Sequence, residues 1–122
     1  MPIFRRWTEQ LKQVGISSGG TGSWGEYSGT IASDALTVNT PGIYCVTPEG
    51  GAADDLKTIT GGNAGDEIIL YPVDSVNTIT VKNGTGNIQI GYDFSLDNTY
   101  DQIRLTKRSD GNWVGGGIND NS

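Results

Sequence analysis

The sequence has no histidine and only one cysteine, Cys45. Without an imidazole, neither a Ser-His-Asp triad nor a Cys-His pair can be built, and most zinc sites are excluded. A single cysteine cannot form an intramolecular disulfide, and its neighbours Ile43, Tyr44 and Val46 predict a small buried apolar residue at this position. From these absences we expect no enzymatic activity and no cofactor.

Long apolar runs are absent too. No segment approaches the length of a membrane span, and the N-terminus lacks the apolar centre of a signal peptide. The formal net charge is −6: Arg5, Arg6 and Lys12 against Glu9 give residues 1–12 a charge of +2, which leaves −8 on the remainder. An acidic body repels a phosphate backbone. We therefore expect no membrane and no nucleic acid among the partners, and synthesis in the cytoplasm without secretion.

What the sequence does contain is glycine, at 19 of 122 positions, beside a modest hydrophobic content of 34%. Glycine is disfavoured inside helices and strands, so this abundance favours a β-rich chain with many tight turns. The regular alternation of Ile, Leu and Val between residues 56 and 105 argues against a disordered chain. The length suits a single domain.

The phrase Asp-x-Ile-x-Leu occurs twice, at residues 66–70 and 101–105, each time after a connection that contains Gly or Asn. In both copies apolar residues alternate with other side chains, which is typical of strands in a layered β-structure. After the second copy, Asp110-Gly111 predicts a tight hairpin turn. The pattern also predicts four side chains that point into the core: Ile68, Leu70, Ile103 and Leu105.

The number of short strands predicts an all-β fold, namely an antiparallel β-sandwich or jelly-roll-like body with a short N-terminal helix or arm. The two copies of the phrase would also fit an internal duplication or a short solenoid, but they agree only in this brief motif. Turns are expected at Ser33-Asp34 and at residues 39–42. Composition divides the chain into an N-terminal amphipathic segment (1–15), a Gly/Ser linker (16–28), a β-domain (29–114) and a flexible tail (115–122).

The N-terminal segment predicts a short amphipathic helix over residues 3–14. Its large apolar residues, spaced 3, 4 and 3 apart, fall on one stripe, and Gly15 is a natural stop. Aromatic side chains are costly to leave in water, so something must cover this stripe. Two possibilities stay open, packing on the chain's own domain and contact with a partner. The candidate partner-binding residues are Phe4, Arg5, Arg6, Trp7, Leu11 and Val14.

Three other kinds of site are less favoured. The glycines within residues 16–28 lack the Gly-Lys-Ser/Thr of a phosphate-binding loop. Glycoside hydrolysis would need a carboxylate pair such as Asp54/Asp55 or Asp97/Asp101, yet such acids are ordinary in turns. Aromatic side chains could stack on sugars, although β-proteins of this size normally use several of them in the core or in interfaces. These aromatic residues are Trp24, Tyr27, Tyr71, Tyr92, Tyr100 and Trp113.

A calcium site is the remaining possibility. Asp93, Asp97, Asn98 and Asp101 supply hard oxygen ligands within nine positions. They lack the Asp-x-Asp-x-Asp-Gly spacing of an EF-hand loop. Asp and Asn also cap turns by bonding to their own backbone, which is the simpler explanation. From the sequence we therefore assign no metal site.

Residues 43–114 carry an ordered series of short motifs. They are Gly-Gly-Ala-Ala-Asp-Asp-Leu-Lys-Thr-Ile-Thr-Gly-Gly (50–62), Gly-Asp-Glu-Ile-Ile-Leu (65–70), Thr-Ile-Thr-Val-Lys-Asn-Gly-Thr-Gly-Asn-Ile (78–88), Asp-Phe-Ser-Leu-Asp-Asn (93–98), Asp-x-Ile-x-Leu (101–105) and Asn-Trp (112–113). This series resembles a module that recurs in virion proteins of tailed bacteriophages. In that family the module is associated with tail fibres, tail appendages and capsid-surface proteins. The resemblance therefore implies a structural virion protein.

The resemblance does not include residues 1–28. A long fibre protein would carry the module as one end of a much larger chain, whereas here the module makes up nearly all of the chain. That arrangement suits a small protein placed many times on a lattice. We therefore expect a capsid decoration (cement) protein, made in the host cytoplasm and located on the outer capsid surface of the virion. It would be a homotrimer that binds the major capsid protein and stabilises contacts between its copies. The alternative is a head-fibre or tail-fibre appendage that binds a host receptor or a glycan.

Overall fold

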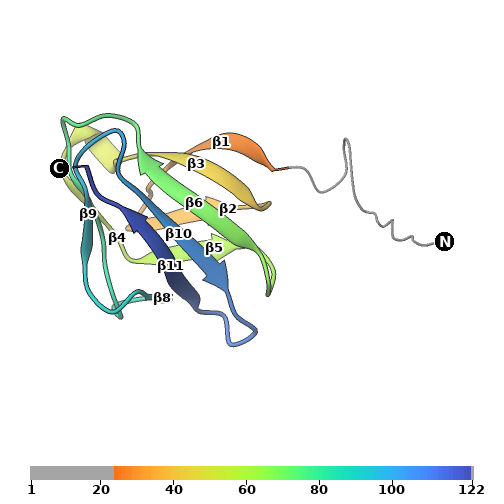
Figure 1. Ribbon diagram of the computed structural model, residues 1–122. Helices are drawn as coiled ribbons and strands as arrows, with labels where there is room; N and C mark the ends of the chain where they lie inside the picture. Colours follow the sequence, from red (N-terminus) through yellow and green to blue (C-terminus); the bar gives the residue numbers. More distant parts are fainter. Residues whose placement is uncertain (1–23, 122) are drawn as a thin grey trace.

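The computed structural model describes residues 24–121, whose regular structure is almost entirely β-strand (Figure 1). No α-helix occurs in this range, and the one helical element is the 3-10 turn η1 at Glu49–Gly51. The strands are β1 (Gly25–Thr30), β2 (Ala35–Val38), β3 (Gly42–Thr47), β4 (Asp54–Leu56), β5 (Thr58–Gly61), β6 (Glu67–Pro72), β7 (Ile79–Val81), β8 (Ile88–Gln89), β9 (Phe94–Leu96), β10 (Gln102–Lys107) and β11 (Trp113–Asn119).

Most of these strands stack in parallel on strands of the preceding turn. On the broad face β1, β3 and β6 are parallel neighbours, while β2 pairs with β5 on a second face and β4 with β7 on a third. Gly42 aligns with Ile68, 26 residues later, and Asp54 aligns with Ile79, 25 residues later. The chain therefore winds around one core as a β-solenoid of about three turns.

The last strands reverse this direction and close one end of the solenoid. β9 runs antiparallel to β7, and β10 runs antiparallel to β6. β11 then forms a hairpin with β10 and returns beside β8, so that the broad sheet has the order β1-β3-β6-β10-β11-β8 (Figure 1). The hairpin predicted at Asp110-Gly111 is confirmed. We call β9 to β11 the antiparallel cap.

The core fills the space between the three faces of the solenoid. Ile68, Leu70, Ile103 and Leu105 are fully buried, as the repeated phrase predicted. The two copies of the phrase are direct neighbours, because Leu70 pairs with Ile103 and Ile68 pairs with Leu105. The other members of the core are Ile31, Leu36, Val38, Tyr44, Val46, Leu56, Ile59, Ile79, Val81, Ile88, Phe94, Leu96 and Trp113.

The predicted antiparallel sandwich is wrong, because most strand pairs are parallel and the strands surround a single core. Side chains alternate in the same way in parallel and antiparallel strands, so the alternation carries no information on direction. The turns predicted at Ser33-Asp34 and at residues 39–42 do separate strands, but the chain turns corners there. The solenoid alternative is correct, although the two copies of the phrase pair antiparallel and are not successive turns.

Two residues show how closely successive turns approach. Gly61, at the end of β5, has φ 92°, and a Cβ there would lie 2.1 Å from the carbonyl oxygen of Val38 on β2. Only glycine permits that approach. Asn87 joins the next turn to β5 through its side chain, because Oδ1 accepts from Ile59 N (2.9 Å) and Nδ2 donates to Ile59 O (2.8 Å).

The strands extend across two of the predicted segment boundaries. β1 begins at Gly25, inside the predicted linker 16–28, and β11 reaches Asn119, inside the predicted tail 115–122, where its residues are exposed. The predicted N-terminal helix lies outside the described residues. So do all six candidate partner-binding residues: Phe4, Arg5, Arg6, Trp7, Leu11 and Val14.

Candidate functional site

One end of the solenoid leaves a strand edge open. β1 pairs along all six of its residues with β3, and its other edge has no strand partner within residues 24–121. Two aromatic side chains are exposed at this end, Trp24 at 43% and Tyr27 at 37%, and the Tyr27 ring lies against Tyr44 with centroids 5.3 Å apart. An open edge beside exposed aromatic residues is a surface suited to contact with another protein.

The broad sheet turns its other side chains outward, away from the core. Ile43, Ile69 and Arg104 are register neighbours on β3, β6 and β10 on this outer face. Ile69 points outward, because the residues on either side of it point inward, yet it is only 7% exposed. The outer face therefore has one nearly buried apolar side chain at its centre. Arg104 Nη1 lies 2.9 Å from Glu67 Oε1. Both side chains are well exposed, so this ion pair adds little stability.

A hydrogen bond crosses the outer face from the middle of the sheet to its open edge. The Tyr71 hydroxyl on β6 donates to Glu26 Oε2 on β1, reaching over β3. This bond raises the pKa of Tyr71 above its ordinary value, and burial adds to the effect. Cys45 on β3 is the register neighbour of Tyr71 and is half-buried, so it is not the fully buried residue that the sequence predicted.

A groove of about 500 Å³ lies where the outer face meets the connection between β9 and β10. It brings together two of the candidate stacking aromatics, Tyr71 and Tyr100. The amides of Asn119 and Asn121 both donate to the Tyr100 carbonyl, at 2.7 and 3.0 Å, and hold this connection against the end of the chain. Aromatic rings beside amide groups offer stacking and hydrogen bonds to a polar ligand. The remaining lining residues are Ile43, Thr99 and Gln102.

The other aromatic candidates are not part of this groove. Trp113 is fully buried in the core, with Lys107 Nζ 5.9 Å from its ring centroid. Tyr92 is exposed at 59%, and Trp24 and Tyr27 lie at the β1 end. The six aromatic residues named from the sequence therefore do not form one stacking surface.

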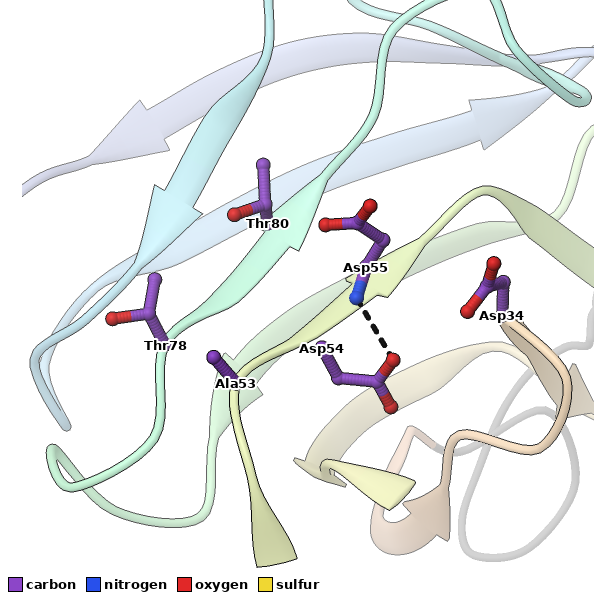
Figure 2. Close-up of a pocket in the computed structure, with 6 residues that line it drawn as sticks. All are labelled: Asp34, Ala53, Asp54, Asp55, Thr78 and Thr80. Carbon is purple, nitrogen blue, oxygen red and sulfur yellow. Dashed lines mark hydrogen bonds between the residues drawn. The ribbon is translucent and has the colours of Figure 1, made fainter. Parts of the chain in front are cut away.

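A smaller pocket of about 280 Å³ lies over β4 and β7 (Figure 2). It contains the candidate carboxylate pair Asp54/Asp55, but Figure 2 shows the two side chains pointing away from each other, as successive residues of a strand do. Asp54 accepts hydrogen bonds from Glu49 N (2.7 Å) and Asp55 N (2.9 Å), and Asp34 pairs with Lys57 at 3.1 Å. These acids support corners of the solenoid and do not converge on a point where a substrate bond could lie.

The acids that raised the question of calcium are only partly brought together. Asp97 and Asp101 converge, and Asp120 from the end of the chain joins them, so that one carboxylate oxygen from each lies within 4.8 Å of the others. Asp93 lies elsewhere, 2.9 Å from Lys82 Nζ. Asp120 follows Asp101 by 19 positions, so no spacing rule in the sequence could reveal its part in the cluster.

Comparisons with known proteins do not assign the chain to a family. No protein-family model matches the sequence, and no curated protein gives a significant match. Within residues 24–121 there is no helix of the length and apolar character that crossing a membrane requires. Function is therefore inferred from the surfaces of the molecule and from the sequence motifs.

Proposed function

We propose that this protein is a structural virion protein that decorates the outer surface of a phage capsid by binding the major capsid protein. The observation that supports this most is the open edge of β1. The antiparallel cap closes one end of the solenoid, whereas the outer edge of β1 has no strand partner within residues 24–121 and lies beside exposed Trp24 and Tyr27. Such an edge pairs with another chain unless something covers it.

The candidate partner-binding segment is covalently joined to this same edge, because residues 1–23 directly precede Trp24 and β1. Phe4 and Trp7 supply apolar anchors, and Arg5 and Arg6 supply positive charge. The remainder of the chain carries −8 outside residues 1–12. A basic segment on an acidic body favours attachment of that end to an acidic partner surface and keeps the rest of the body turned away from it.

We also propose that the protein is a homotrimer. Cyclic association gives every copy the same contact surface, and a stable contact buries about 1,000 Å² or more. Sedimentation equilibrium of the purified full-length chain tests this, with three times the chain mass of 12.9 kDa expected. A monomer at micromolar concentration would contradict the trimer without touching the capsid proposal.

Copy number and location on purified particles test the capsid proposal directly. Quantitative mass spectrometry and labelling for electron microscopy should find hundreds of copies over the shell. A handful of copies at the tail would contradict it.

A pair of full-length variants tests the attachment segment. Phe4→Ser/Trp7→Ser should lose binding to capsids that lack the protein, because both apolar anchors are removed, while the Tm of the body stays unchanged. The control Gln10→Ser/Gln13→Ser alters residues off the apolar stripe and should bind as the parent does. Full binding by the first variant would remove the N-terminal segment from the proposal.

The alternative is a fibre or tail appendage that binds a host glycan, and the groove at Tyr71 and Tyr100 favours it. Tyr100 is 75% exposed and stands beside the amides of Asn119 and Asn121. A stacked pair of aromatic rings contributes on the order of 1 kcal/mol, and the apolar face of a sugar ring would make a comparable contact with Tyr100. Tyr100→Ala should then weaken binding to the host surface, with Tyr92→Ala, an exposed tyrosine outside the groove, as the control. Equal binding by both variants would exclude the groove as a glycan site.

A further inference from the structure

Three carboxylates from two segments, the connection between β9 and β10 and the end of β11, meet at the edge of the antiparallel cap. Asp97 directly follows β9, Asp101 directly precedes β10, and Asp120 directly follows β11. One oxygen from each lies within 4.8 Å of the others. Asp101 is 0% exposed, and its oxygens accept three backbone N–H groups, those of Asp97 (3.0 Å), Asn98 (3.1 Å) and Asn121 (2.6 Å). Such donors hold the Asp101 carboxylate fixed at the centre of the cluster.

A second observation concerns Asp97. Its Oδ1 is buried and has no hydrogen-bond partner in the part of the chain that the structure describes. Buried polar atoms in folded proteins are nearly always paired, and a buried carboxylate oxygen without a partner is especially costly. No Lys or Arg of residues 24–121 forms an ion pair with Asp97 or Asp101. Asp97 and Asp101 thus place two like charges close together, and one buried oxygen of Asp97 lacks a donor.

We propose that Asp97, Asp101 and Asp120 bind a divalent cation, and that Ca²⁺ is the preferred ion. A cation between the three carboxylates offsets the repulsion between Asp97 and Asp101 and gives the buried Asp97 Oδ1 a partner. Ca²⁺ binds oxygens at about 2.3–2.6 Å, so two oxygens on one ion are separated by at most about 5 Å. Mg²⁺ binds at about 2.0–2.1 Å, which limits that separation to about 4.2 Å. The three oxygens lie within 4.8 Å of one another. Ca²⁺ suits such a set better because its coordination is flexible, whereas Mg²⁺ requires near-ideal octahedral geometry.

The position of this site gives the cation a structural role. It links the end of β11 to both ends of the connection between β9 and β10, and so fastens the last strand onto the cap. The same connection carries Tyr100, whose carbonyl accepts bonds from Asn119 and Asn121 on either side of Asp120. Binding of Ca²⁺ therefore also fixes one wall of the groove.

Calcium titration of the full-length chain tests the site. After treatment with EDTA, calorimetry with CaCl₂ alone should give a Kd of about 0.1–1 mM, the range of sites with few protein ligands. Saturating Ca²⁺ should raise the Tm by about 5 °C or more, because the ion binds the folded state only. MgCl₂ should have a smaller effect. No heat and no change in Tm up to about 10 mM Ca²⁺ would overturn the proposal.

Matched variants separate a cation site from a purely structural cluster. Asp97→Asn removes one charge, so its affinity for Ca²⁺ should fall about tenfold or more, while its Tm in EDTA should equal or exceed that of the parent because repulsion is relieved. Asp110→Asn removes the same charge from an exposed turn and should respond to Ca²⁺ as the parent does. If Asp97→Asn lowered the Tm equally with and without Ca²⁺, the cluster would be structural only.

Discussion

Strands β1 to β7 stack in parallel, whereas β9 and β10 run antiparallel to the strands beside them. In the parallel part successive turns approach closely, as at Gly61, where a Cβ would lie 2.1 Å from the carbonyl oxygen of Val38. In the cap the chain returns through the tight turn at Asp110-Gly111 and buries Trp113 over the core. Both parts bury apolar residues of the same kinds. They differ in how the backbone is connected.

This difference distinguishes the two ends of the strand stack within residues 24–121. A stack of parallel turns does not terminate by itself, because the exposed strand edges of its last turn can pair with the strands of a further turn. β10 and β11 terminate the stack on one side by reversing the chain direction. On the β1 side no such reversal occurs within residues 24–121, and the outer edge of β1 has no strand partner in that range.

The largest effect is expected from a charge placed in the core that both parts share. Ile103 of the cap pairs with Leu70 of the parallel part, and both are fully buried. Ile103→Asp should unfold the whole body, because an unpaired buried carboxylate costs several kcal/mol. Circular dichroism and thermal melting measure this. Val76→Asp, at a position that is 82% exposed, should leave the Tm nearly unchanged. A variant at Ile103 that kept a folded parallel part would show that the two parts fold independently.

A glycine pair tests the close approach of turns in the parallel part. Gly61 and Gly65 have nearly the same φ, 92° and 93°, but only at Gly61 would a Cβ meet a neighbour, the Val38 carbonyl at 2.1 Å. Gly61→Ala should cost about 3 kcal/mol and Gly65→Ala about 1 kcal/mol in urea unfolding, because the second suffers only the backbone strain. Equal losses would mean that the turns can separate without penalty.

Asn87 tests the junction between the two parts. Its side chain holds the backbone of Ile59 in the parallel part, and its carbonyl accepts from Trp113 N in the cap at 2.7 Å. Asn87→Ala should lower the free energy of unfolding by about 2 kcal/mol, because two partly buried backbone groups lose their partners. Asn77→Ala, which removes one exposed bond to Gly51 O, should cost about 0.5 kcal/mol. Similar losses in the free energy of unfolding for the two variants would show that the junction at Asn87 is no more important for stability than an exposed hydrogen bond.

The smallest effect concerns Lys82 and Asp93, which join the end of parallel β7 to the start of antiparallel β9. The backbone N–H of Asn83, and then Lys82, lower the pKa of Asp93 below its ordinary value of 3.8. Its contribution to stability is therefore present above the unfolded-state pKa and is lost as the pH falls through the lower folded-state value. The group is exposed, so the change should be small.

Melting curves of the parent and of Asp93→Asn, at about pH 7 and about pH 2.5, check this. The parent should have the higher Tm at neutral pH, and the difference should shrink on acidification because Asp93 becomes neutral like the amide. A difference that did not change with pH would show that the charge of Asp93 is unimportant.

Much of the local structure could be predicted from the sequence. The alternation in the two Asp-x-Ile-x-Leu copies correctly placed Ile68 and Ile103 in the core, and Asp110-Gly111 correctly marked a hairpin. The architecture could not be predicted, because a run such as Leu36-Thr37-Val38 alternates in the same way whichever neighbour it pairs with. In the sequence, Gly61 belongs to the glycine-containing connection before the first copy of the phrase. In the structure, the lack of a Cβ at Gly61 permits its close approach to Val38.

The candidate sites show the same limit. Asp97 and Asp101 were recognised because they are close in sequence, and the turn-capping explanation is correct for Asn98, whose Oδ1 accepts from Tyr100 N at 2.9 Å. Asp120 was missed because its neighbours in the cluster lie about 20 positions away in the chain. The groove likewise joins residues from β3, β6 and the end of the chain, which no local pattern connects.

By itself, the sequence determined that Ile68, Leu70, Ile103 and Leu105 enter the core and that a hairpin turns at Asp110-Gly111. Both properties depend on residues within a few positions of each other, through the alternation of side chains and the conformational freedom of glycine. Only the tertiary structure decided that most strands run parallel, that β1 has no second strand partner within residues 24–121, and that Asp120 meets Asp97 and Asp101. These outcomes depend on which distant segments pair, and a backbone ladder can be completed in either direction at similar energy.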